Sequence, residues 1–134
     1  MSDEMVFVVD DDADVRDSLC ALLESAGVAA EAYDSARAFL DAYQPERPGC
    51  LIADIRMPDM DGLELQEELN RRSGALPVIV VTGHADVPLA VRAMKAGAVD
   101  LIEKPYDDAL LLASVRRALA RAQSVREQVA VAGD

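Results

Sequence analysis

The stretch LPVIVVT, residues 76–82, decides the fold because it is a continuous apolar run that is rich in β-branched residues. A strand that is apolar at every position has to be covered on both faces, which is typical of a parallel sheet flanked by helices. The segments on either side of this run are therefore expected to be helices that cross over the sheet, and not the partners of a hairpin.

Working outward from residues 76–82, helical and extended patterns alternate in both directions. The apolar residues recur at helical spacing in some segments and form short unbroken runs in others. Strands are predicted at 6–9, 28–33, 50–54, 76–82 and 98–104, and helices at 15–26, 35–40, 62–72, 88–96 and 111–122. This alternation predicts an α/β protein: a doubly wound, five-stranded parallel sheet of order 2-1-3-4-5 with five helices.

Composition narrows the class of protein. The chain has 134 residues, of which 51% are hydrophobic and 28% charged, so one globular domain is expected. No apolar run approaches the roughly 18 residues that a membrane span needs. The net charge of −12 repels phosphate backbones, which argues against direct nucleic-acid binding. Cys20 and Cys50 have no metal-ligand spacing and are expected to be reduced, buried thiols in a cytoplasmic protein.

Polar residues interrupt the apolar strands at one kind of position, the carboxyl end. These residues are Asp10, Asp11, Asp54, Thr82 and Lys104, and they come from four separate strand–helix units. The carboxyl ends of parallel strands meet at one edge of the sheet, where open α/β proteins bind their ligands. The five side chains are therefore predicted to form one site.

The residue types predict the chemistry of that site. Three crowded carboxylates repel one another, and Mg²⁺ relieves the repulsion because it prefers carboxylate oxygens, water and phosphate. Lys104 adds a positive charge suited to phosphate, and Thr82 adds a hydroxyl donor. Asp54 in these surroundings is equipped to attack a phosphoryl group and form an aspartyl phosphate.

The motifs together resemble the receiver domain of two-component response regulators. They are the pair Asp10-Asp11, Asp54 with the following MPDMDG, Thr82, and Lys104-Pro105. The stretches DIRMPDMDGLEL, VTGHADVPLAVRAMKAGAVD and IEKP are most similar to the FixJ-type subfamily. The resemblance spans residues 5–122 and implies a flavodoxin-like receiver fold. We expect a receiver domain over 1–122 and a helix end or linker over 123–134.

The resemblance also implies roles for the acidic residues. A histidine kinase would donate a phosphoryl group to Asp54. Asp11, Asp54 and the main-chain carbonyl of Arg56 would bind Mg²⁺, with Asp10 helping through a water molecule, and Mn²⁺ is expected to substitute.

The remaining site residues carry the switch. By the resemblance, Thr82 and Lys104 would hold the phosphoryl oxygens, and the bond from Lys104 to Pro105 would be cis. The family usually has an inward-swinging aromatic residue three positions before the lysine. This sequence has Leu101 there, and Tyr106 is the nearest aromatic but not at the family position.

The function implied is that of a phosphorylatable switch and not of a turnover enzyme: the domain would catalyse only its own phosphorylation and dephosphorylation. Phosphorylation is expected to strengthen a homodimer through the helix from Val87, the fifth strand and the last helix. Relatives of the FixJ type control transcription through a helix-turn-helix domain. None lies within these 134 residues, which fits a receiver cut from a longer regulator or a single-domain regulator.

Other polar residues have structural interpretations. We expect Asp12 to cap the first helix and Asp59 and Asp61 to shape the turn before Gly62. His84, the only histidine, is expected to be a loop residue.

Three other functions compete with this interpretation. A calcium-binding EF-hand loop would place Met57 at its first ligand position, and Pro58 interrupts the loop. A phosphatase of the haloacid dehalogenase type needs a second acid two residues after the nucleophile, where this chain has Arg56. A receiver-like domain that binds partners without phosphorylation stays open as an alternative.

Overall fold

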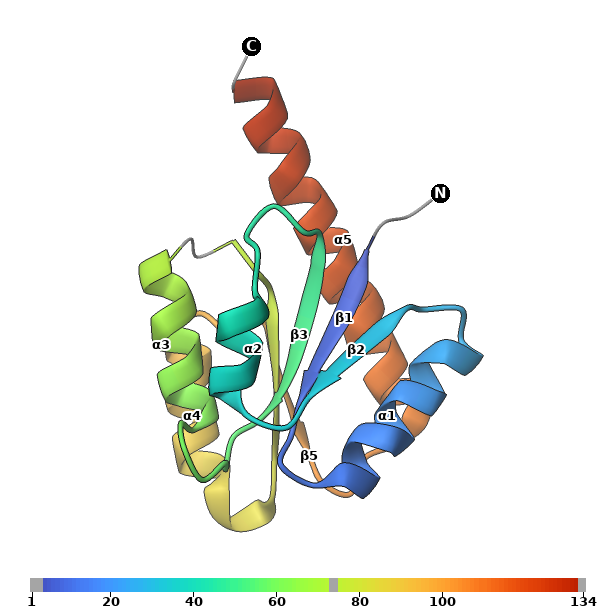
Figure 1. The fold of residues 1–134 in the computed structure, drawn as a ribbon, viewed down its shortest axis with the longest axis vertical. Helices are drawn as coiled ribbons and strands as arrows, with labels where there is room; N and C mark the ends of the chain where they lie inside the picture. The colour runs from blue at the N-terminus through green and yellow to red at the C-terminus, as the bar shows by residue number, and fades with distance from the viewer. Residues whose placement is uncertain (1–3, 73–74, 133–134) are drawn as a thin grey trace.

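The computed structural model describes residues 4–72 and 75–132. Its centre is a five-stranded sheet of order β2-β1-β3-β4-β5, and every neighbouring pair of strands is parallel (Figure 1). The predicted fold class and strand order are confirmed, and the architecture is flavodoxin-like. All five strands point the same way, so their carboxyl ends share one edge of the sheet.

Most element boundaries lie close to the predicted ones. The strands are β1 Met5–Val9, β2 Ala30–Tyr33, β3 Gly49–Asp54, β4 Val78–Thr82 and β5 Asp100–Glu103. The helices are α1 Ala13–Ser25, α2 Ala36–Ala42, α3 Gly62–Arg72, α4 Val87–Lys95 and α5 Asp108–Ala132, with a 3₁₀ turn, η1, at His84–Asp86. β2 is shorter than expected. Helix α5 continues well past residue 122 and projects beyond the sheet (Figure 1), whereas the last two residues of the predicted tail lie outside the described part.

The sheet separates two apolar cores, because successive strand residues point to opposite faces. Val6 and Val8 pack with α1 and α5, whereas Phe7 and Val9 pack with α2, α3 and α4. Figure 1 shows the same division of the helices over the two faces. Burial on both faces explains why the strands read as unbroken apolar runs.

Side-chain caps fix where the helices begin. Asp12 accepts a hydrogen bond from the Asp14 amide at 2.9 Å at the start of α1, as predicted. Before α3, Asp61 Oδ1 accepts from the Glu64 amide at 2.8 Å, and Glu64 Oε1 accepts from the Asp61 amide at 3.2 Å. This reciprocal pair is a capping box, so Asp61 acts in the turn as expected.

Both cysteines are free thiols, although Cys20 is only half-buried and Cys50 alone is fully buried. Helix α5 is the longest helix of the described part, and neither it nor any other described helix is apolar enough to cross a membrane.

Candidate functional site

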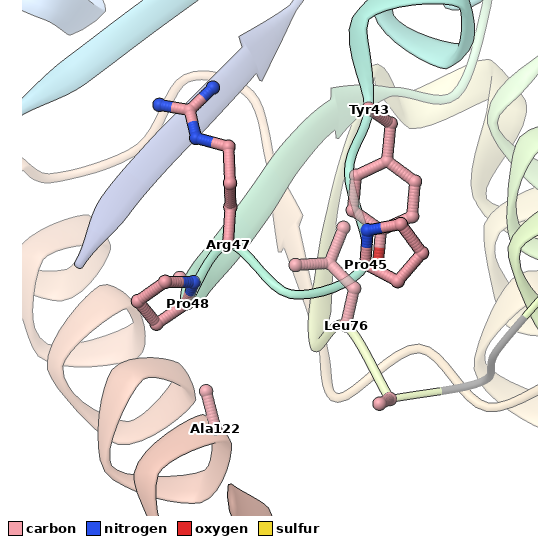
Figure 2. A pocket seen from close by; sticks show the side chains of 8 residues that line it. Tyr43, Pro45, Arg47, Pro48, Leu76 and Ala122 are labelled. Carbon is pink, nitrogen blue, oxygen red and sulfur yellow. The ribbon is translucent and has the colours of Figure 1, made fainter. Parts of the chain in front are cut away.

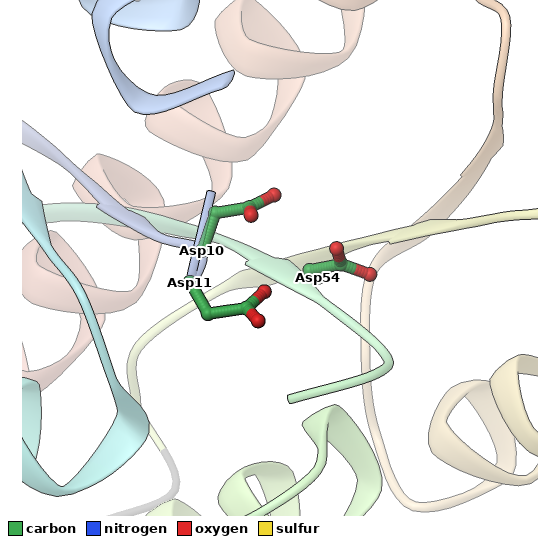
Figure 3. Close-up of side chains that lie close together, drawn as sticks. All are labelled: Asp10, Asp11 and Asp54. Carbon is green, nitrogen blue, oxygen red and sulfur yellow. The ribbon is translucent and has the colours of Figure 1, made fainter. Parts of the chain in front are cut away.

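Three carboxylates meet at the carboxyl edge of the sheet. Asp10 directly follows β1, Asp11 is next in the chain, and Asp54 is the last residue of β3. Each offers one oxygen, and these oxygens all lie within 4.8 Å of one another (Figure 3). Asp10 is 4% exposed, Asp54 is half-buried and Asp11 faces solvent. The register explains the meeting, because Val9 pairs with Ala53 and the next residue of each strand is acidic.

Local hydrogen bonds hold Asp10 in place. Its Oδ1 accepts from the Asp12 amide at 2.9 Å, and its main-chain oxygen accepts from Arg16 Nη1 of α1 at 2.8 Å. The turn that carries the acidic pair is thus attached to the helix that follows it.

Lys104, which directly follows β5, brings a positive charge to the carboxylates. Its Nζ donates to Asp54 Oδ2 at 3.2 Å and lies 3.9 Å from Asp10 Oδ2. Its main-chain amide donates to the Thr82 carbonyl at 2.8 Å, and the bond to Pro105 is cis. Two chain segments fifty residues apart are therefore joined by one ion pair.

The electrostatics of the cluster are unbalanced. The pKa of Asp10 is raised to about 6: burial is the main cause and the charge of Asp54 adds to it, while the Asp12 amide and Lys104 oppose the rise. Burial alone would lower the pKa of Lys104, but Asp54 and Asp10 outweigh it and the pKa is raised. The single Lys104 ammonium thus lies beside three carboxyl groups and cannot balance the charge of all of them.

This donor set fits a hard divalent cation. Three carboxylates converge on one point, and carboxylate oxygen is the ligand that Mg²⁺ prefers. Two other acidic residues argue against the EF-hand alternative, because both have protein partners: Asp59 Oδ2 accepts from the Arg37 amide of α2 at 3.3 Å, and Asp61 caps α3.

Thr82 is the last residue of β4, at the same edge as the cluster, whereas Leu101 lies within β5. Thr82 is fully buried, and its hydroxyl donates to the carbonyl of Gly83 at 3.0 Å. Leu101 is half-buried and packs against the core under α2, α3 and α4. Tyr106, the nearest aromatic residue, packs against the opposite core. Thr82 therefore lies at the predicted edge, with its hydroxyl turned toward its own loop.

One interaction at this edge could not be predicted from the sequence. The Arg56 amide donates to Asp54 Oδ1 at 3.2 Å, and the Arg56 side chain reaches across to Asp86 at the end of η1. Its Nε donates to Asp86 Oδ1 at 3.0 Å, and its Nη2 makes a second, shorter contact with the same oxygen. Residues thirty positions apart give no sequence signal of pairing.

Comparison with known proteins agrees with the fold and the acidic cluster. The family model of the response regulator receiver domain matches residues 6–116, and the chain belongs to that family. It is the receiver domain of a FixJ-like response regulator of two-component systems, and so a regulator and not a classical enzyme.

Among its relatives is the transcriptional regulatory protein FixJ of Azorhizobium caulinodans, 57% identical over 87% of this chain and 55% of that protein. FixJ of Bradyrhizobium diazoefficiens is 46% identical over 96% of this chain and 63% of that protein. The structure of the response regulator StyR superposes with a TM-score of 0.93 at 42% identity, covering 98% of this chain and 67% of that chain. The chain thus spans little more than half the length of the first of these relatives.

Membership fixes some general properties. Receiver domains bind Mg²⁺ at an acidic pocket, work with histidine kinases and often dimerise. This chain has a cluster of three aspartates, Asp10, Asp11 and Asp54, at the carboxyl edge of its sheet.

Proposed function

We propose that this domain is a phosphorylation switch in which Asp54 accepts a phosphoryl group from a histidine kinase. The observation that carries the proposal is the Asp54 carboxylate itself, 3.2 Å from the Lys104 ammonium and within 4.8 Å of two further carboxylates. A nucleophile, a phosphate-binding cation and a set of metal ligands stand together, which is what phosphoryl transfer requires.

In the proposed transfer, an Asp54 oxygen attacks the phosphorus of a phosphohistidine. The new O–P bond forms as the P–N bond breaks, and the bonding electrons leave with the imidazole nitrogen. Bound Mg²⁺ supplies positive charge that neutralises the transferring oxygens. Asp11, Asp54 and the main-chain carbonyl of Arg56 would hold it, with Asp10 acting through water, and Mn²⁺ would substitute.

Lys104 and Thr82 would hold the phosphoryl oxygens after transfer. Lys104 is already in place, whereas the Thr82 hydroxyl has to turn away from the Gly83 carbonyl. Attack by water on the same phosphorus returns Asp54 and inorganic phosphate. The domain thus catalyses only its own modification and its removal.

The output surface proposed is α4-β5-α5. Two large apolar side chains are exposed there: Val91 of α4 is 40% exposed and Leu110 of α5 is 54% exposed. We propose that phosphorylation strengthens a homodimer through this surface.

Because the FixJ relatives are transcriptional regulators of about twice the matched length, we propose that the dimer controls transcription in the cytoplasm through a DNA-binding domain.

The test is the intact mass after incubation with acetyl phosphate, in Mg²⁺ and then in chelator. We expect one acid-stable, base-labile phosphoryl adduct that needs Mg²⁺ and is lost in Asp54→Asn. Asp59→Asn is the matched control, since Asp59 lies in the loop after β3 and outside the acidic cluster. An adduct that survives in Asp54→Asn would refute the proposal. No adduct in the wild type despite Mg²⁺ binding would favour a phosphorylation-independent binding module.

A further inference from the structure

Asp86 occupies a position that suits two different partners. It precedes α4 as its N-cap residue, and aspartate is among the best N-cap residues because its carboxylate accepts from a free helix amide. Its side chain makes no such hydrogen bond. The carboxylate is instead held by Arg56, which approaches from the loop after β3.

The backbone agrees with this choice of partner. Asp86 has φ −104° and ψ 7°, whereas N-cap residues usually adopt the extended region. Pro88 stands at the start of α4 and has no amide hydrogen, so Leu89 is the nearest amide that a capping carboxylate can bind. Capping would therefore need a rotation about ψ of Asp86, and this rotation would change η1.

Arg56 also has an alternative partner. Its own amide is bonded to Asp54 Oδ1, so its side chain starts next to the phosphoryl acceptor. A phosphoryl group carries about −1.5 to −2 charges and three acceptor oxygens, and arginine binds such a group bidentately. The Arg56 side chain is 72% exposed, and an exposed pair with a single carboxylate shifts an equilibrium by only about five-fold at most.

We infer that Asp86 and a phosphoryl group on Asp54 compete for the Arg56 guanidinium, and that the displaced Asp86 carboxylate then caps α4 at Leu89. This inference rests on the proposed function for the identity of the competing group. Arg56 becomes a further phosphoryl ligand, and Asp86 is the positioning residue that keeps it aside in the unmodified protein.

The exchange gives a path to Thr82. The Gly83 carbonyl accepts both the Thr82 hydroxyl at 3.0 Å and the Asp86 amide at 3.0 Å. A change in the backbone of Asp86 therefore acts on the turn whose Gly83 carbonyl also holds the Thr82 hydroxyl. The exchange of partners at Arg56 thus links the acceptor Asp54 to the start of α4.

The test uses amide NMR of the unmodified protein and the affinity of beryllofluoride, a phosphoryl mimic, in Mg²⁺. Asp86→Asn keeps the capping group but weakens the ion pair, and Arg56→Gln removes the ion pair while keeping the main-chain carbonyl. Without mimic, both should move the Leu89 amide resonance toward its position in the beryllofluoride-bound wild type. Asp86→Ala, which cannot cap, should not. Arg71→Gln, which breaks an exposed pair with Glu68 on α3, is the matched control.

The two variants should then differ in affinity. Arg56→Gln should bind beryllofluoride about three- to ten-fold more weakly because it lacks the proposed ligand, whereas Asp86→Asn should bind at least as tightly as the wild type. Equal losses in both variants would overturn the exchange, and so would a Leu89 resonance that neither variant moves. If the wild type forms no adduct, the proposed function fails, while a Leu89 shift shared by unmodified Asp86→Asn and Arg56→Gln, and not seen in Asp86→Ala, still decides whether Asp86 changes partner.

Discussion

The two ends of the sheet are built on different principles. At the carboxyl end, three carboxylates and one lysine crowd together, and the pKa of Asp10 is raised to about 6. At the amino end, side chains of the loops that precede the strands pack around a small cavity of about 40 Å³ (Figure 2). This cavity is lined by Tyr43, Pro45, Arg47, Pro48, Gly49, Ala75, Leu76 and Ala122.

The charge of Arg47 at the amino end is partnered. Arg47 Nη2 lies 2.8 Å from Glu31 Oε2 on β2, and its guanidinium stacks over the Phe7 ring at 5.2 Å. We therefore expect the stability of the domain to depend on side-chain packing at the amino end of the sheet, and on charge, pH and cations at the carboxyl end.

The largest effect on stability is expected from Gly49→Ala at the amino end. Gly49 has φ +152°, and a Cβ there would lie 1.9 Å from the Met5 carbonyl oxygen. The strand pair has to separate, so the free energy of unfolding should fall by about 3 kcal/mol or more. Urea denaturation measures this loss, with Gly83→Ala as the control because a Cβ at Gly83 meets nothing within 4 Å. Equal losses in the two variants would contradict the contrast between the two ends.

A smaller effect of the opposite sign is expected from Asp10→Asn at the carboxyl end. The folded protein holds the Asp10 proton with a pKa of about 6, against 3.8 for the ordinary group, so wild-type stability in chelator should fall as the pH rises from about 4 to about 6. Asparagine removes this loss and keeps an acceptor for the Asp12 amide. The variant should therefore gain about 1–2 kcal/mol over the wild type above pH 6, and little near pH 4.

Urea unfolding at pH 4.5 and pH 7.5, in about 0.1 M salt, where the Debye length is about 10 Å, checks the Asp10 prediction. Saturating Mg²⁺ should stabilise the wild type and reduce the advantage of the variant. An advantage that does not change with pH would show that the charge of Asp10 is not its cause.

The smallest effect is expected from Arg47→Met, which keeps the apolar stem of the side chain and removes its charge. The half-exposed pair with Glu31 and the stacking on Phe7 together should contribute about 0.5–1 kcal/mol. The loss should also be halved in high salt, which screens the ion pair but not the packing. Unlike the change at Asp10, it should leave Mg²⁺ affinity unaltered.

The sequence predicted the place of the site because topology alone determines it. Once parallel strands are read from runs such as residues 76–82, Asp10, Asp54 and Thr82 have to share an edge. Side-chain direction could not be predicted in this way. The Thr82 hydroxyl bonds to Gly83, and the Arg56 guanidinium crosses to Asp86, because each follows from rotamers that no periodicity encodes.

The end of α5 is a second instructive difference. The apolar stripe weakens after Ala122, where the sequence pattern predicted a helix end or a linker, and the structure has helix as far as Ala132. The continuation over 123–132 contains two glutamines, two alanines, one arginine and one glutamate, which favour a helix, beside three valines, which favour it less. Intrinsic propensity can thus extend a helix where the apolar stripe of the sequence is weak.

The central position of β3 has a consequence for how the domain opens. This strand is hydrogen-bonded to β1 on one side and β4 on the other, and its residues from Gly49 to Ala53 are all buried. Its amides should exchange with deuterium only through global unfolding, whereas η1, on the rim, exchanges through local opening. Asp54 therefore belongs to the slowest-exchanging strand of the domain, whereas η1 is among the fastest-exchanging segments. Partial destabilisation would unfold η1, and with it the response to phosphorylation, while β3 and the acceptor Asp54 stay folded.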